Sequence, residues 1–195
     1  SVGDRVGLLV EGRGAAWVVQ NGRRVVKSPC DIPTQVPLYA VVDLLGNTAG
    51  VSLLPGARPP ISFHRGTAGR YVAISKDGLS ATHKDPTGYE MRGLAFLSDP
   101  LPLFEEGAYF EVRVDQVCAG HDDGLTLGIS TMMPDVDDSG LLAADTVHES
   151  WSIGFDGQTY CNGQMAPVGW RPSCLSIGDR VGLLVSRGGG SAWVV

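Results

Sequence analysis

The chain has 195 residues, of which 43 % are apolar and 18 % are charged. This apolar content can form a buried core and argues against a disordered protein. The formal net charge of −6 is opposite in sign to what phosphate neutralisation requires, so no nucleic-acid partner is expected. No apolar run approaches the roughly 18 to 20 residues that span a bilayer, so no membrane partner is expected either.

Short strand-like runs recur along the chain between glycine and proline residues. In chain order they cover residues 6–10, 17–19, 39–43, 50–54, 71–75, 110–114 and 125–130. This rhythm predicts an all-β fold, an antiparallel two-sheet β-sandwich. Helix evidence is thin, and only residues 139–148 would accept one helical turn.

Local patterns support this prediction. Asn21-Gly22 separates two strand-like runs and supplies the positive φ angles of a tight hairpin turn. Asp77-Gly78 predicts a second hairpin. Within residues 108–115 apolar and charged side chains alternate, which predicts one buried and one solvated face.

The cysteines bear on the cellular compartment. Cys30, Cys118, Cys161 and Cys174 show no Cys-x-x-Cys spacing, and the chain has no Asn-x-Ser/Thr acceptor. We therefore expect buried free thiols in a reducing compartment, and a cytoplasmic location.

The chain contains an internal repeat. Residues 1–10 match residues 176–185 with one change, and Ala-Trp-Val-Val at 16–19 recurs at 192–195. We interpret the chain as one period of an array, cut out of phase. Residues 1–55 would be the C-terminal part of a repeat, 56–60 a linker and 61–195 the front and centre of a repeat. Residues 1–55 would complete 61–195 within one chain or, by strand exchange, in a neighbour, giving a homo-oligomer.

With its halves reordered, the chain resembles the Neuralized homology repeat, a relative of the SPRY sandwich. The resemblance rests on Phe63-His64, on residues 93–98, 110–114 and 125–130, and above all on 37–46 with 50–54. It implies a protein-interaction module, found in ubiquitin ligases and multi-repeat scaffold proteins. Some members bind asparagine-containing peptides. Ligase chemistry in the family resides in a separate RING domain, so no enzyme is expected here.

Motifs for chemistry are missing from the sequence. There is no nucleophile elbow, zinc helix or phosphate loop, and His64, His83, His121 and His148 are scattered. Residues 135–140 imitate an EF-hand start, but Thr146 stands where that loop requires glutamate. We expect no cofactor and no metal.

Aromatic and amide residues in turn-rich sequence are the candidate binding residues for a peptide or protein ligand. They are Tyr160, Asn162, Trp170 and Arg171. Trp170 could equally be a core residue, whereas Trp151, Trp193, Tyr39 and Phe63 are expected in the core. The leading hypothesis is peptide or protein-surface recognition. The alternative is a structural module that assembles by strand exchange, and a carbohydrate-binding sandwich ranks third.

Overall fold

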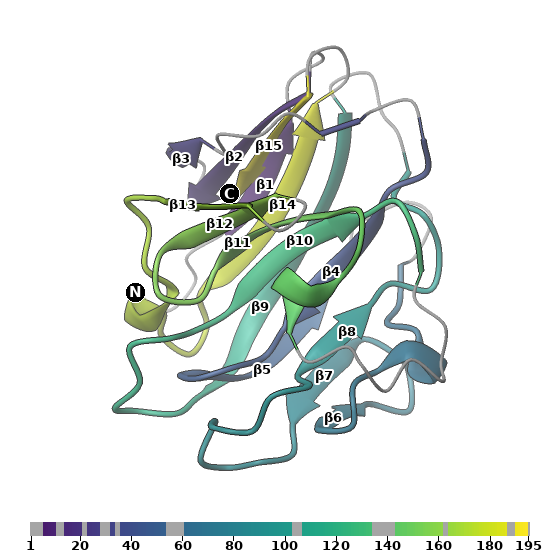
Figure 1. The fold of residues 1–195 in the computed structure, drawn as a ribbon. Helices are drawn as coiled ribbons and strands as arrows, with labels where there is room; N and C mark the ends of the chain where they lie inside the picture. The colour runs from purple at the N-terminus through teal and green to yellow at the C-terminus, as the bar shows by residue number, and fades with distance from the viewer. Residues whose placement is uncertain are drawn as a thin grey trace.

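The computed structural model describes most of the chain. The described residues are 6–10, 14–20, 23–27, 32–33, 36–53, 61–102, 107–133, 143–161, 164–186 and 190–194. They form two β-sheets packed face to face, with three single turns of 3-10 helix (Figure 1). The all-β sandwich expected from the sequence is confirmed.

The larger sheet, called the nine-stranded sheet, follows the order β1-β2-β15-β14-β9-β5-β7-β6, with β3 paired to β2. Its strands are β1 (Val6–Val10), β2 (Gly14–Gln20), β3 (Arg23–Lys27), β5 (Thr48–Leu53), β6 (Val72–Ile74), β7 (Ser80–His83), β9 (Gly107–Val117), β14 (Arg180–Ser186) and β15 (Gly190–Val194).

The six-stranded sheet follows the order β13-β12-β11-β10-β4-β8 and lies in front of the other in Figure 1. Its strands are β4 (Tyr39–Asp43), β8 (Leu94–Phe96), β10 (Thr126–Ser130), β11 (Ser150–Gly154), β12 (Gln158–Cys161) and β13 (Gln164–Pro167). The 3-10 turns are η1 (Arg65–Thr67), η2 (Ala144–Thr146) and η3 (Pro172–Cys174). The single turn expected within 139–148 is therefore present as η2.

Both expected hairpins are present in the strand pairing. β2 and β3 pair antiparallel with Gln20 opposite Arg23, on either side of Asn21-Gly22. β6 and β7 pair antiparallel, and Gly78 adopts the positive φ of 77° that this turn requires.

The main core lies between the two sheets. Period-two alternation supplies it: Phe110, Val112 and Val114 on β9 point inward and are fully buried, as the sequence pattern predicts. Leu127 and Ile129 on β10 meet them from the six-stranded sheet.

The outer face of the six-stranded sheet is also covered. A second apolar cluster lies there under the loop that carries η2, which Figure 1 shows against the front of this sheet. Its members are Val41, Leu94, Phe96, Ala143, Ala144, Val147 and Phe155. β4 is thus buried on both faces, which explains its nearly continuous apolar sequence.

Strands from both sequence segments build each sheet. β4 lies between β10 and β8, and β5 lies between β9 and β7. Residues 39–53 therefore supply an interior strand to each layer formed with residues 61–186. The boundaries expected at residues 55 and 61 stay a prediction, because residues 54–60 lie outside the described part.

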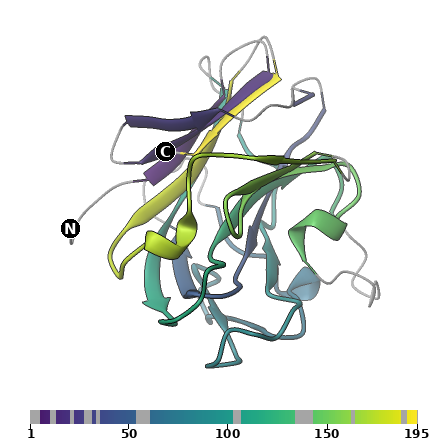
Figure 2. The same ribbon diagram turned by 60° about the vertical axis from the view of Figure 1, so that its left-hand side comes forward.

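The repeated hairpins meet at one edge of the nine-stranded sheet. β2 pairs with β1, β3 and β14 antiparallel and with β15 in parallel. In Figure 2 the purple β1 lies beside the yellow C-terminal strands. A strand has two edges and pairs with two neighbours at once. β14 pairs with β9, with Val181 opposite Val112, and β1 also lies near β9. The two copies of the hairpin therefore compete for one place beside β9.

Candidate binding site

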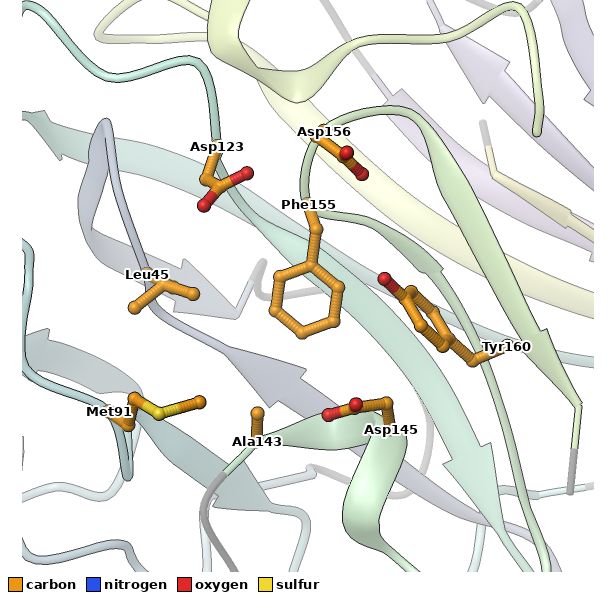
Figure 3. A pocket seen from close by; sticks show the side chains of 8 residues that line it. All are labelled: Leu45, Met91, Asp123, Ala143, Asp145, Phe155, Asp156 and Tyr160. Atoms are coloured by element: carbon orange, nitrogen blue, oxygen red, sulfur yellow. The ribbon is translucent and has the colours of Figure 1, made fainter. Parts of the chain in front are cut away.

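A pocket of about 220 Å³ opens on the outer face of the six-stranded sheet (Figure 3). Residues far apart in the sequence line it: Leu45, Met91, Asp123, Ala143, Asp145, Phe155, Asp156 and Tyr160. The lining combines apolar, aromatic and acidic side chains. It is a shallow recess suited to a side chain of a ligand.

Two aromatic rings form the back of the pocket. β12 pairs with β11 so that Tyr160 lies opposite Ser152, which places the Tyr160 side chain on the outer face of the sheet. Phe155 is the first residue of the three-residue turn between these strands. The two rings meet edge to face, with centroids 5.4 Å apart and planes at 88°. This is a favoured aromatic geometry that fixes both rings.

The backbone of Phe155 is in the left-handed region, with φ of 49°. A bulky side chain rarely adopts this conformation, and it costs about 1–3 kcal/mol. The Phe155 N–H donates a buried hydrogen bond of 3.0 Å to Thr126 Oγ1, which stabilises the turn. Arg92, next to the pocket residue Met91, also has a positive φ, of 73°. Strained backbone in a pocket residue and in the neighbour of another is typical of functional sites.

Three carboxylates surround the rings. In Figure 3 Asp123 and Asp156 lie on one side of the Phe155 ring and Asp145 lies on the other. Partial burial raises the pKa of Asp123, with further contributions from the neighbouring charges of Asp156 and Asp122, while His121 lowers it. Burial, and then the charges of Asp156, Asp145 and Asp123, raises the pKa of the Tyr160 phenol to about 12. The pocket is therefore a site of negative potential.

A buried acid lies beneath the η2 wall. Asp43, at the end of β4, is 1 % exposed and accepts a hydrogen bond of 2.9 Å from the Ala144 N–H. Burial raises the pKa of Asp43 to about 7; the Ala144 hydrogen bond opposes this, and the charge of Asp145 adds to it. Asp43 thus fixes the backbone immediately before Asp145.

The rim near Met91 is a hydrogen-bonded loop with an exposed aromatic residue. Asp85 accepts hydrogen bonds from the Thr87 hydroxyl and from backbone N–H groups of the loop, which together lower its pKa to about 2. Tyr89 is 75 % exposed and its ring lies 4.5 Å from that of His121. Met91 is 46 % exposed. Large apolar side chains presented to solvent on an ordered loop are available to a partner.

The family model described as Neuralized matches residues 1–55 and 63–191. The chain belongs to the Neuralized family. Neuralized domains are protein-interaction modules that bind protein partners. No solved structure matches the chain.

The four residues proposed from sequence lie in different surroundings in this Neuralized domain. Tyr160 lines the pocket. Trp170 is 4 % exposed in the main core, so of its two interpretations the structure supports the core one. Arg171 is exposed, beside the turn that carries Phe155, and Asn162 lies outside the described residues. A binding role for any of them stays a prediction.

The other aromatic and charged candidates from sequence are also located. Phe63 is a core residue as expected, while Tyr39 is only partly buried and Trp151 packs on the core from a partly buried position. Residues 135–140 and the side chain of Trp193 lie outside the described part. Among the described residues, no group of three or more His, Cys, Asp or Glu side chains could hold a metal ion.

Sequence reasoning missed most of the pocket. Phe155-Asp156-Gly157 carries a turn signal, Asp-Gly after a strand, that could have directed attention to it. The approach of Asp123 and Asp145 to that turn depends on the folded chain and has no local signal.

The expectation of free thiols is wrong for Cys161. Cys161, adjacent to Tyr160 on β12, is disulfide-bonded. Cys118 and Cys174 are free as expected, but Cys118 is only partly buried and Cys174 is exposed, so the expectation of burial is wrong for both. Cys30 lies outside the described residues. A disulfide removes the cysteine argument for a reducing compartment, so the cytoplasmic location stays a prediction. No helix in the described ranges is long and apolar enough to cross a membrane.

Proposed function

We propose that this Neuralized domain binds a peptide segment of a partner protein in the pocket on the outer face of the six-stranded sheet. The observation that carries this proposal is the ordered recess behind Met91, with Phe155 held in a left-handed conformation against Tyr160. A recess lined by fixed aromatic rings is the geometry of an anchor pocket at a protein interface. The family supports a protein ligand rather than a reaction substrate.

The fold explains why the recess is preformed. Tyr160 stands on a paired strand, Phe155 is held by Thr126, and the η2 wall is held by Asp43. Because these side chains are ordered before binding, little conformational entropy is lost when a ligand enters. A preformed site of this size accommodates one anchor side chain and leaves the rest of the segment on the surface.

A phage-displayed library of random peptides, selected on the immobilised chain, tests the proposal. Selected peptides should lose about 10-fold or more in affinity for Tyr160→Ala and Met91→Ala, because both side chains line the pocket. Met91 is exposed, so its variant keeps the fold. Ile177→Ala removes an exposed apolar side chain outside the pocket and should bind as the wild type. Selected peptides that bind all four proteins equally would contradict the proposal.

We also propose, as a second candidate, assembly of copies by hairpin exchange. Residues 6–10 and 181–185 are identical, and β2 pairs with both β1 and β14. Because only one hairpin can occupy the place beside β9, the other remains to pair with a second chain.

Light scattering across a concentration series tests this second candidate. Assembly predicts a wild-type mass at or above that of a dimer and a monomer for Leu8→Pro, since proline in β1 removes one competing strand. A wild type that is monomeric throughout, or a variant that associates equally, would contradict it.

A further inference from the structure

We propose that the pocket selects a cationic side chain, arginine or lysine, of the bound segment; this inference rests on the proposed function. The recess provides space for one side chain of the ligand, and the charges around the recess determine which side chain binds. Asp123, Asp145 and Asp156 border the recess, and none of its eight described lining residues is basic. A cationic group entering it replaces mutual repulsion of carboxylates with attraction.

The apolar walls match the rest of such a side chain. Lysine and arginine carry apolar stems that pack along aromatic and aliphatic surface while the charged head contacts polar groups. Phe155, Tyr160 and Met91 supply that surface, and Figure 3 shows the carboxylates around them. A guanidinium or ammonium group near the Tyr160 ring also gains a cation–π contact. Aromatic and acidic walls therefore favour the same ligand.

The spacing of the carboxylates argues against a bare metal ion as the occupant. They lie on separate walls around the Phe155 ring, and in the described part of the chain no three such groups converge closely enough to hold a metal. Recognition at several separated carboxylates suits an extended organic cation. Of arginine and lysine, arginine is the better match, because its guanidinium is delocalised.

The raised pKa of the Tyr160 phenol supports this electrostatic picture. After burial, its three causes are the charges of Asp156, Asp145 and Asp123, which are the carboxylates that border the pocket. His121 offsets part of this charge near Asp123. The phenol stays neutral around neutral pH and can accept a hydrogen bond from a cationic head or donate one to a carboxylate.

Hexapeptide pools with one fixed and five random positions, labelled with a fluorophore, test the inference on the full chain. The fixed residue is arginine, lysine, citrulline or glutamate; citrulline has the shape of arginine without its charge. We expect about 5-fold greater retention of the arginine and lysine pools than of the citrulline and glutamate pools, as for a partly exposed charge pair. This preference should weaken at high salt.

Matched variants test whether the preference for the arginine and lysine pools arises in the pocket. Asp145→Asn and Asp156→Asn each remove one exposed pocket charge, and each should reduce the preference by at least about half. Asp99→Asn removes one exposed charge outside the pocket and should leave the preference unchanged. Equal loss with Asp99→Asn would mean that overall charge, and not the pocket, attracts the pools, which overturns the inference.

The remaining outcomes separate this inference from the proposed function. Retention that depends on Met91 and Tyr160 but is equal for arginine and citrulline pools overturns charge selection and leaves the peptide site standing. Retention of every pool that is unchanged by Met91→Ala and Tyr160→Ala overturns both.

Discussion

The outer face of the six-stranded sheet and the edge of the nine-stranded sheet beside β9 differ in how many segments of the chain can occupy each position. On the outer face each wall of the pocket is formed by a segment that occurs once in the chain, such as the Phe155 turn or η2. Each of these segments makes one set of contacts. At the edge beside β9, β1 and β14 share the sequence Val-Gly-Leu-Leu-Val, and both pair with β2.

This difference determines how each region responds to substitution. A site built from unique segments is fixed by its buried contacts, so a substitution that removes one of these buried contacts changes both stability and binding. An edge that two equal sequences can fill should tolerate damage to either copy.

Leu127→Ala should have the largest effect. Leu127 is fully buried on β10, in the middle of the six-stranded sheet and behind the pocket. Leucine-to-alanine substitution in a core lowers the free energy of unfolding by about 2–5 kcal/mol, measured by urea denaturation. Ile177→Ala, at an exposed position, should stay within about 0.5 kcal/mol of the wild type. Equal effects of the two substitutions would contradict the described core.

Proline substitutions in the two copies should be strongly non-additive. Leu8 and Leu183 occupy equivalent positions in the repeat. Each single substitution to proline should cost less than about 1 kcal/mol, because the intact copy can fill the place beside β9. The double variant should cost about 3 kcal/mol or more, the effect of proline inside a sheet without a replacement strand. Additive losses in urea denaturation would show that the two hairpins are not interchangeable.

These two regions also show what sequence alone could predict. The alternation in β9 and the turn residues Asn21-Gly22 and Asp77-Gly78 are local signals, so the sandwich and its hairpins could be predicted from them. Trp170 was ambiguous because a tryptophan after a glycine gives no information on which face it will occupy.

The pocket could not be predicted for a different reason. Asp123, Asp145 and Asp156 come from three separate loops, and only the packing of η2 and the β11–β12 turn brings them together. Asp43 looks from sequence like an ordinary strand-ending polar residue. Its burial becomes evident only when the η2 loop covers it.

Asp43→Asn should stabilise the fold in a pH-dependent way. The pKa of Asp43 in the folded chain is about 7, against 3.8 for an exposed aspartate. Between these values the unfolded chain loses a proton that the folded chain retains, so the free energy of unfolding falls as pH rises. By pH 8 the ionisation of Asp43 lowers the free energy of unfolding by at most about 4 kcal/mol. Asparagine can still accept the Ala144 hydrogen bond and does not titrate.

Urea denaturation at pH 4 and pH 8 measures this effect. The advantage of Asp43→Asn over the wild type should be larger at pH 8 than at pH 4. Asp99→Asn, an exposed control, should show no such pH dependence. An advantage that is equal at both pH values would contradict the buried neutral acid.

Thr126→Val should have a modest effect on stability and a clear effect on binding. It leaves the buried N–H of Phe155 without its acceptor, which costs about 1–2 kcal/mol. Because the same hydrogen bond holds the left-handed Phe155, selected peptides should also bind more weakly. Unchanged peptide affinity, measured by fluorescence anisotropy, would show that the turn does not depend on Thr126.

Methyl NMR of the methionines during titration with a selected arginine-containing peptide shows whether a ligand occupies the pocket. The chain has four methionines, so four methyl signals report on different places. Met91 lines the pocket, whereas Met132 and Met165 are exposed outside it. Binding in the pocket predicts a saturable shift of the Met91 signal, with contacts to the arginine methylene groups. A Met91 signal that stays unchanged while another methionine shifts would place the binding site elsewhere.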